Sequence, residues 1–249
     1  MTRAEQIVAN LVEVRARLAA ALAEARRKPG APASVGLLAV SKTVPPEEIV
    51  TALQAGQRDF AENYGQEFRD KYAAVASLVA ATPGLATPRW HFIGPLQSNK
   101  VKYVAGKVAL VQSVASPEVL AELERKSAAL GVVQDCLIQV NVAGEVQKSG
   151  ISPAVLPSIL DSFAERPHLR CTGLMVIPPY DETPELSRPH FAALRRLRDD
   201  QRAQTRPNVV LTELSMGMSH DMEVAIAEGA TIVRVGTAIF GARTYGGSP

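Results

Sequence analysis

Eight short apolar segments, separated by stretches long enough for a helix, dominate the 249-residue sequence and restrict the folds open to it. The segments are residues 35–41, 58–63, 90–94, 109–114, 136–142, 171–177, 211–215 and 231–236. Strands that are apolar on both faces and alternate with helices are typical of parallel sheets. Eight such units of about thirty residues each predict a closed (β/α)8 barrel of the TIM type, with an open doubly wound sheet as the alternative.

A long amphipathic helix is predicted before the first apolar segment, within residues 1–28. Its apolar stripe consists of Ile7, Leu11, Val14, Leu18 and Leu22. We expect this helix to pack on the barrel, because the sequence after residue 236 is too short for a full final helix. No linker separates two regimes of composition, so residues 1–249 are expected to form a single domain.

The charge of the chain excludes several classes of partner. The formal net charge is +2, from 27 basic and 25 acidic residues, which produces no field strong enough to favour nucleic acid or an anionic membrane surface. The N-terminal helix lacks the continuous apolar core of a signal peptide, so a cytoplasmic location is expected. Cys136 and Cys171 lie in separate apolar segments, which favours buried structural thiols over a redox or metal site.

Active sites of such barrels lie at the carboxyl ends of the strands, where each apolar segment gives way to polar residues. Lys42 stands directly after the first segment. A surface lysine and an amine that forms a Schiff base are both consistent with that position. The second interpretation requires a lowered pKa, because only the neutral amine attacks an aldehyde.

Two further clusters follow the seventh and eighth segments. Ser215 ends the seventh, a Gly-containing turn follows, and Ser219 is expected to cap a helix whose first turn holds Asp221. Arg234 lies within the eighth segment, and Gly236 and Thr237 end it.

These two loops together form the usual phosphate site of a (β/α)8 barrel. They do not form a nucleotide-triphosphate loop. Gly236 and Gly241 have the right spacing, but Ala242 and Arg243 replace the Lys-Ser/Thr pair that such a loop needs.

Seven motifs, spread over nearly the whole chain after the first helix, resemble one known family. They are AVSKT around Lys42, FAENYGQE, WHFIGPLQSNK, QVNVAGEVQKSGI, GLMVIPP, LSMGMSHDMEVAI and RVGTAIFGAR. In their order and spacing they resemble the YggS/PROSC-type pyridoxal phosphate homeostasis proteins. This resemblance implies a barrel like the N-terminal domain of alanine racemase, with pyridoxal 5′-phosphate (PLP) held on Lys42 as an internal aldimine.

The resemblance also implies the residues that surround the cofactor. Ser215, Gly236 and Thr237 would hold the phosphate, and Ser219 with the backbone around Met218 would add contacts. Arg234 matches the position that faces the pyridine nitrogen, where a permanently charged guanidinium leaves that nitrogen unprotonated and the cofactor a weaker electron sink. Asn63, at the end of the second segment, is expected to hydrogen-bond the edge of the cofactor.

Four other residues of these motifs have less specific roles. Tyr64 is expected to begin the helix after the second segment. His91 is interpreted as a hydrogen-bonded core histidine, with a catalytic role as the alternative. For Lys100 and Lys148, guidance of an anionic cofactor and an ordinary surface position remain equal alternatives.

The expected function is that of a carrier or regulator of PLP, because two-base racemisation needs a proton acceptor on each face of the cofactor and only Lys42 is a clear candidate. PLP-dependent apo-enzymes are the expected recipients, and the protein is expected to be a monomer. A weak racemase-like enzyme acting on amino acids, with His91 or Tyr64 as its second base, is one alternative. A Schiff-base aldolase acting on a phosphorylated sugar is another.

Overall fold

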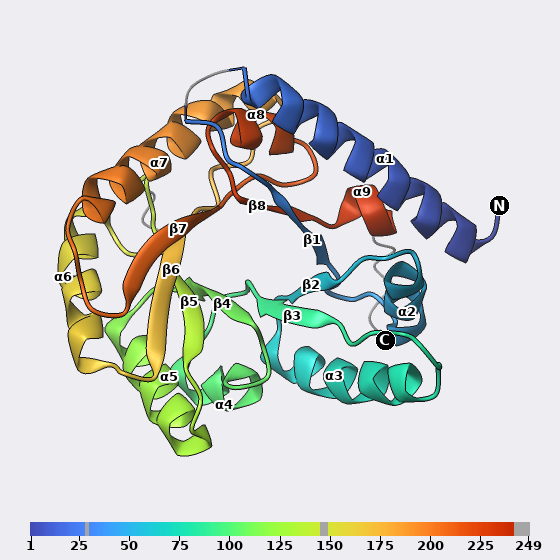
Figure 1. Ribbon diagram of the computed structural model, residues 1–249, viewed down its shortest axis with the longest axis horizontal. Coiled ribbons are helices and arrows are strands. Elements are labelled where there is room, and N and C mark those ends of the chain that lie inside the picture. The colour runs from blue at the N-terminus through green and yellow to red at the C-terminus, as the bar shows by residue number, and fades with distance from the viewer. Residues whose placement is uncertain (28–29, 145–148, 242–249) are drawn as a thin grey trace, which may run out of the picture.

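The computed structural model describes residues 1–27, 30–144 and 149–241, and it contains a closed barrel of eight parallel strands (Figure 1). The strands are β1 (Gly36–Val40), β2 (Asp59–Glu62), β3 (Arg89–Phe92), β4 (Leu110–Val114), β5 (Gln134–Gln139), β6 (Leu169–Met175), β7 (Val209–Ser215) and β8 (Ile232–Val235). Each strand pairs with the next one along the sequence, and β8 closes the ring against β1. The predicted (β/α)8 barrel is confirmed, and the open sheet is excluded.

Helices surround this ring on the outside, as Figure 1 shows. The α-helices are α1 (Arg3–Ala25), α2 (Pro46–Gln54), α3 (Gly65–Ala80), α4 (Val101–Val104), α5 (Pro117–Leu130), α6 (Leu156–Asp161), α7 (Arg188–Arg202), α8 (Met222–Ala227) and α9 (Thr237–Phe240). The 3₁₀ helices are η1 (Ser98–Lys100), η2 (Pro153–Val155), η3 (Ser162–Glu165) and η4 (Pro184–Ser187). Helix α5 illustrates the local signals: the Ser116 hydroxyl accepts the N–H of Val119, and Gly131 ends the helix at φ 65°.

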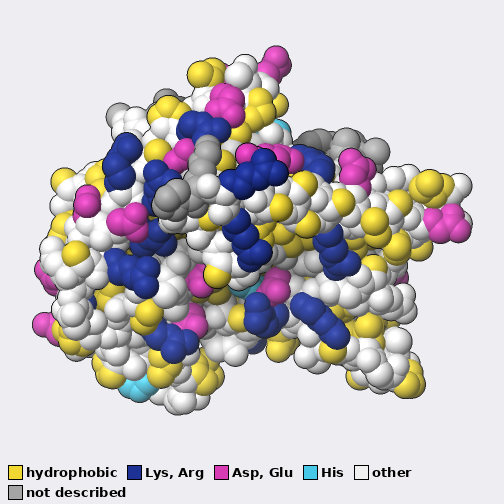
Figure 2. All heavy atoms as spheres, turned by 45° about the horizontal axis from the view of Figure 1, so that its top comes forward, with side chains coloured by type: hydrophobic (Ala, Val, Ile, Leu, Met, Phe, Trp, Pro, Cys, Tyr) yellow, Lys and Arg dark blue, Asp and Glu magenta, His cyan; other side chains and the backbone are white. Residues whose placement is uncertain are grey.

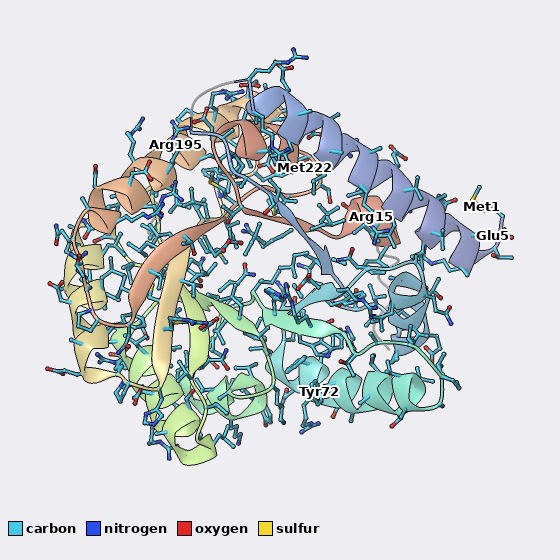
Figure 3. All side chains as sticks on the ribbon, in the orientation of Figure 1. Met1, Glu5, Arg15, Tyr72, Arg195 and Met222 are labelled. Carbon is cyan, nitrogen blue, oxygen red and sulfur yellow. The ribbon has the colours of Figure 1, made fainter. Side chains whose placement is uncertain are left out.

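The N-terminal helix α1 packs on α2, α8 and α9, and so covers the part of the barrel next to β8. Ile7, Leu11 and Val14 of its apolar stripe are buried, and the rest of the stripe is half-buried against the same core. Figure 3 shows Met222, the first residue of α8, on the inner side of this helix. The predicted N-terminal helix is present, and its apolar stripe faces the core.

Side chains alternate along each strand between the barrel interior and the layer under the helices. In β3, Trp90 faces outward and packs on Phe60 and Phe68, with ring centroids 5.8 Å and 5.6 Å away. His91 and Ile93 belong to the opposite, inward set, and Ile93 packs with Leu38 of β1 inside the ring. The interior is therefore filled by side chains, as Figure 3 shows.

Acidic and basic side chains are interspersed over the face drawn in Figure 2, without a large area of one sign. This mixture agrees with the nearly balanced composition of the sequence. In the part of the chain that the structure describes, no helix has the length and apolar character needed to cross a membrane.

Gly173 allows β6 and β7 to approach closely. A Cβ atom at this position would lie 2.0 Å from the carbonyl oxygen of Glu213, which is far inside contact distance. We expect Gly173→Ala to lower the free energy of unfolding by about 1–3 kcal/mol, because the two strands must separate to admit the methyl group. Gly36→Ala is the matched control in β1, where the new Cβ would meet only Thr231 O at 3.7 Å. Equal urea midpoints for the two variants would refute this account.

Candidate functional site

A cavity of about 250 Å³ lies at the carboxyl ends of β1 and β8. Its lining includes Lys42 and Thr43 after β1, and Gly236 and Thr237 after β8. This is the end of a (β/α)8 barrel that carries active sites. The structure thus brings together the lysine and part of the phosphate cluster that the sequence placed at separate strand ends.

Lys42 is half-buried and follows β1 by two residues, as predicted. The residue after it, Thr43, has a φ of 64°, a left-handed conformation that is uncommon for a β-branched residue. Backbone strain of this kind persists only where the surrounding structure holds it in place.

A hydrogen-bonded group centred on the buried ion pair of Lys71 and Glu62 holds the backbone on both sides of Lys42. We call this group, which consists of Ser41, Thr43, Glu62, Glu67 and Lys71, the outer network. The Lys71 Nζ donates to the Ser41 carbonyl oxygen at 2.6 Å, to Glu62 Oε1 at 2.8 Å and to Glu67 Oε1 at 2.7 Å. Glu67 Oε1 also accepts the N–H of Thr43 at 2.6 Å, and Glu62 Oε1 accepts the Ser41 hydroxyl at 2.7 Å.

Glu62 is the most deeply buried acid of the outer network. Its side chain is fully buried, and its second oxygen, Oε2, has no hydrogen-bond partner in the described part of the chain. Burial raises the pKa of Glu62, although Lys71 and the Ser41 hydroxyl oppose that effect. The outer network was not predicted from the sequence. The spacing of Glu67 and Lys71, at i and i+4 of a helix, was the signal that could have indicated an ion pair there.

The loops after β7 and β8 meet at two hydroxyl groups. The Thr237 hydroxyl donates to Ser219 Oγ at 3.2 Å, and Ser219 Oγ also accepts the N–H of Ala238 at 3.5 Å. At Gly236, an added Cβ would lie 3.3 Å from the carbonyl oxygen of Val40. Glycine therefore lets β8 leave the barrel close to β1.

The predicted helix cap at Ser219 is wrong. Helix α8 begins only at Met222, and Asp221 is its N-cap residue. Residues 219–221 form a turn, so Ser219 lies too far before the helix to reach its first N–H groups. Asp221 Oδ1 instead accepts the N–H of Met218 at 2.6 Å, which closes the turn and engages the backbone donor of Met218.

Arg234 and Ser215 lie inside the barrel, below the mouth. The guanidinium donates through Nη1 to Ser215 Oγ at 2.7 Å and through Nη2 to the carbonyl oxygen of Val176 at 2.9 Å. Burial lowers the pKa of Arg234 to about 10, and nearby Asp221 opposes that shift, so the side chain stays charged at neutral pH.

Asn63 follows β2, with its backbone against Gly94, where an added Cβ would lie 1.9 Å from Asn63 O. The Asn63 Oδ1 is buried and, within the described residues, has no hydrogen-bond partner. A buried acceptor of this kind is suited to a donor from a bound ligand. Tyr64 is the N-cap residue of α3 and is largely exposed, which confirms that the helix begins there.

His91 is a core histidine, as interpreted. Its Nε2 lies 3.1 Å from Asp59 Oδ1, and its Nδ1 lies 3.0 Å from Gln112 Nε2. It lines a second cavity, of about 530 Å³, at the amino ends of the strands. That larger cavity contains none of the residues predicted to bind the cofactor, and its arginines Arg89 and Arg170 already pair with aspartates.

The remaining sequence predictions concern lysines and thiols. Lys100 is half-buried, with Nζ 5.7 Å from the centroid of the Tyr103 ring, and Lys148 lies outside the described residues. Cys136 and Cys171 are both buried, and burial raises the pKa of each thiol, that of Cys171 to about 12. The described residues contain no group of three or more His, Cys, Asp or Glu side chains able to hold a metal ion.

The family model for the N-terminal domain of alanine racemase matches residues 14–244. The chain belongs to this family. Among the proteins similar to it, the pyridoxal phosphate homeostasis protein of Aquifex aeolicus is 48% identical over 84% of this chain and 87% of its own. The protein of that name from Pseudomonas aeruginosa is 46% identical over 96% of this chain and 97% of its own.

One solved structure is similar to this chain in both sequence and fold. PipY of Synechococcus elongatus PCC7942, solved with PLP bound, is 35% identical, with a TM-score of 0.80 over 94% of this chain and all of PipY. The likeness to PipY thus agrees with the barrel fold and with the match to the family model.

Proposed function

We propose that this protein binds PLP at the carboxyl end of its barrel, joined covalently to Lys42, and serves in the homeostasis of that cofactor. The observation that carries the proposal is that Lys42, Gly236 and Thr237 line one cavity. An amine and a phosphate-binding turn in one cavity match the two ends of PLP, its aldehyde and its phosphate.

When bound, PLP supplies an aldehyde that condenses with a primary amine. The neutral amine is the nucleophile in that reaction, and Lys42 is the lysine that lines this cavity among the described residues. The Ser219 hydroxyl keeps its hydrogen for the phosphate, and the Thr237 hydroxyl can turn its hydrogen from the long 3.2 Å bond to Ser219 toward the same phosphate. Gly236 permits close approach of the backbone.

The residues around the ring fit the cofactor as well. The unpartnered Oδ1 of Asn63 is suited to a polar group at the edge of the ring. Arg234 remains charged, so a guanidinium that faces the pyridine nitrogen keeps that nitrogen unprotonated. A cofactor that is a weak electron sink is poorly suited to converting amino acids. It is better suited to a protein whose role is to hold PLP.

The relatives support the same proposal. Two of them, at 48% and 46% identity, carry the name pyridoxal phosphate homeostasis protein, and PipY binds PLP. The proposal extends to delivery of PLP to apo-enzymes by a monomeric, cytoplasmic protein. Buried free thiols are compatible with a reducing compartment. The racemase alternative gains no support from His91, which lines the cavity at the other end of the barrel.

The test is an absorbance spectrum of the purified protein with added PLP, before and after borohydride reduction, followed by peptide mass analysis. We expect a visible band that borohydride removes, and a pyridoxyl mass on the peptide that contains Lys42. A protein that gives no band even with excess PLP would overturn the proposal and favour the aldolase alternative, which needs the lysine but no cofactor.

A further inference from the structure

A line of polar side chains crosses the interior of the barrel beneath the candidate site. We call the group of Asp59, His91, Gln112, Ser215 and Arg234 the interior network. Its members come from β2, β3, β4, β7 and β8. The network therefore crosses the barrel from β4 to β7 and β8, on the opposite side of the ring. Four of the five side chains are buried, and only Asp59, which lines the cavity at the amino ends of the strands, is partly exposed.

Four hydrogen bonds with short donor–acceptor distances join the five side chains in one continuous chain. Arg234 Nη1 lies 2.7 Å from Ser215 Oγ, and Ser215 Oγ lies 2.6 Å from Gln112 Oε1. The Gln112 Nε2 lies 3.0 Å from His91 Nδ1, and the His91 Nε2 lies 3.1 Å from Asp59 Oδ1.

The upper end of the network determines the direction of the first three bonds. A guanidinium can only donate, so Ser215 Oγ accepts from Arg234. The Ser215 hydroxyl hydrogen is then directed to the Gln112 carbonyl oxygen. Because that oxygen accepts, the Gln112 amide group donates to His91 Nδ1, which must carry no hydrogen.

The lower end requires the same direction independently. Burial opposes ionisation of Asp59, but hydrogen bonds from His91 and Arg89 outweigh that effect and hold the pKa of Asp59 below its ordinary value. The ionised carboxylate can only accept, so the hydrogen of a neutral His91 lies on Nε2. Both ends therefore assign His91 the same tautomer, and every bond of the network has one direction.

This direction changes the role of Ser215. Sequence reasoning grouped Ser215 with the phosphate-binding residues, yet its only hydroxyl hydrogen is committed to Gln112 and its oxygen accepts from Arg234. Ser215 is also fully buried, whereas Ser219 and Thr237 are not. The hydroxyl of Ser215 thus holds the guanidinium and has no hydrogen left for a phosphate.

We propose that Gln112 is a positioning residue for Arg234: through the Ser215 hydroxyl it orients the guanidinium toward the ring nitrogen of bound PLP, and His91 in turn orients Gln112. This inference rests on the proposed function, because it assigns Arg234 to the cofactor ring. All four side chains lie beneath the cavity that contains Lys42 and none of them lines it; Arg234 is two residues before Gly236, which does. Gln112 and His91 act through Ser215 and Arg234.

The test compares Gln112→Leu with Gln134→Leu in the otherwise intact protein. Gln134 is likewise a buried glutamine, in β5, and within the described residues its side chain bonds only backbone groups of residues 106, 108 and 135. We expect Gln112→Leu to bind added PLP about tenfold more weakly, the equivalent of one buried polar group left unpaired. We also expect its visible absorbance maximum to shift. Gln134→Leu should match the wild type in both respects.

Gln112→Glu is the conservative variant. A carboxylate at this position still accepts the Ser215 hydroxyl but cannot donate to His91 Nδ1, so we expect PLP affinity between those of the wild type and Gln112→Leu. A loss as large as that of Gln112→Leu would overturn the route through Ser215. Equal affinities and spectra for Gln112→Leu and Gln134→Leu would overturn the positioning role itself.

The third measurement needs neither a variant nor PLP. Nitrogen-15 NMR of the cofactor-free wild type should show the His91 hydrogen on Nε2 and a bare Nδ1 at neutral pH. A hydrogen on Nδ1 would reverse the lower bonds and overturn the inference. Failure of the proposed function is distinguishable, because the wild type itself would then give no visible band with PLP.

Discussion

Lys42→Ala abolishes the visible band that the wild type is expected to give with added PLP, and borohydride then leaves no pyridoxyl mass on the variant. The loss is complete, because alanine has no amine to react with the aldehyde. Lys42→Arg should behave in the same way, since it keeps a positive charge but lacks a primary amine of suitable pKa. The pair of variants thus separates covalent attachment from simple attraction of the phosphate.

The control for these variants is Lys107→Ala, which removes an exposed lysine in the turn after α4. Its spectrum and its pyridoxyl peptide should match those of the wild type. A reducible band that survives in Lys42→Ala, with the mass on another lysine, would show that PLP attaches elsewhere and would contradict the assignment of Lys42.

The barrel could be predicted from the sequence because the same pattern recurs eight times. An apolar segment that is buried on both faces, followed by a helix, determines the architecture even when single boundaries are wrong. The fifth segment is an example: it was predicted over 136–142, whereas β5 comprises Gln134–Gln139. Val140 is buried but forms only an isolated bridge with Ile151, since apolar character reports burial and not strand pairing.

From the sequence, only those residues of the candidate site that directly follow a strand could be predicted. Lys42, Gly236 and Thr237 meet in one cavity because all carboxyl ends of a parallel barrel lie at one end. The bonds of Ser215 could not be predicted, because they depend on which residues of β4 and β8 face it across the ring. The pair Gln112 and Ser113 inside an apolar strand was the available signal that the interior contains polar groups.

Lys71→Met is expected to lower the free energy of unfolding by about 3–5 kcal/mol, the range found when one partner of a buried ion pair is removed. Lys71 is the cation of the outer network, and its loss leaves the fully buried Glu62 without a compensating charge. It also removes the donor to the carbonyl oxygen of Ser41. Urea unfolding followed by circular dichroism measures the effect.

Two controls make this prediction specific. Lys102→Met, at an exposed position of α4, should change stability by no more than about 0.5 kcal/mol. The double variant Glu62→Gln with Lys71→Met should recover much of the loss, because it removes the buried charge that Lys71 had compensated. If Lys71→Met costs no more than Lys102→Met, the outer network does not stabilise the fold.

The loss in Lys71→Met should also depend on pH, because it acts through Glu62. Burial already raises the pKa of Glu62 above its ordinary value of 4.5, and removal of Lys71 raises it further. A carboxyl group whose pKa is higher in the folded state binds more protons there, so stability falls as the pH rises from the unfolded pKa to the folded one. The destabilisation should therefore be larger at neutral pH than near pH 4.5, and the difference should vanish in the double variant, where no carboxyl remains at position 62. A pH-independent loss in Lys71→Met would instead locate its cause in the broken bond to Ser41.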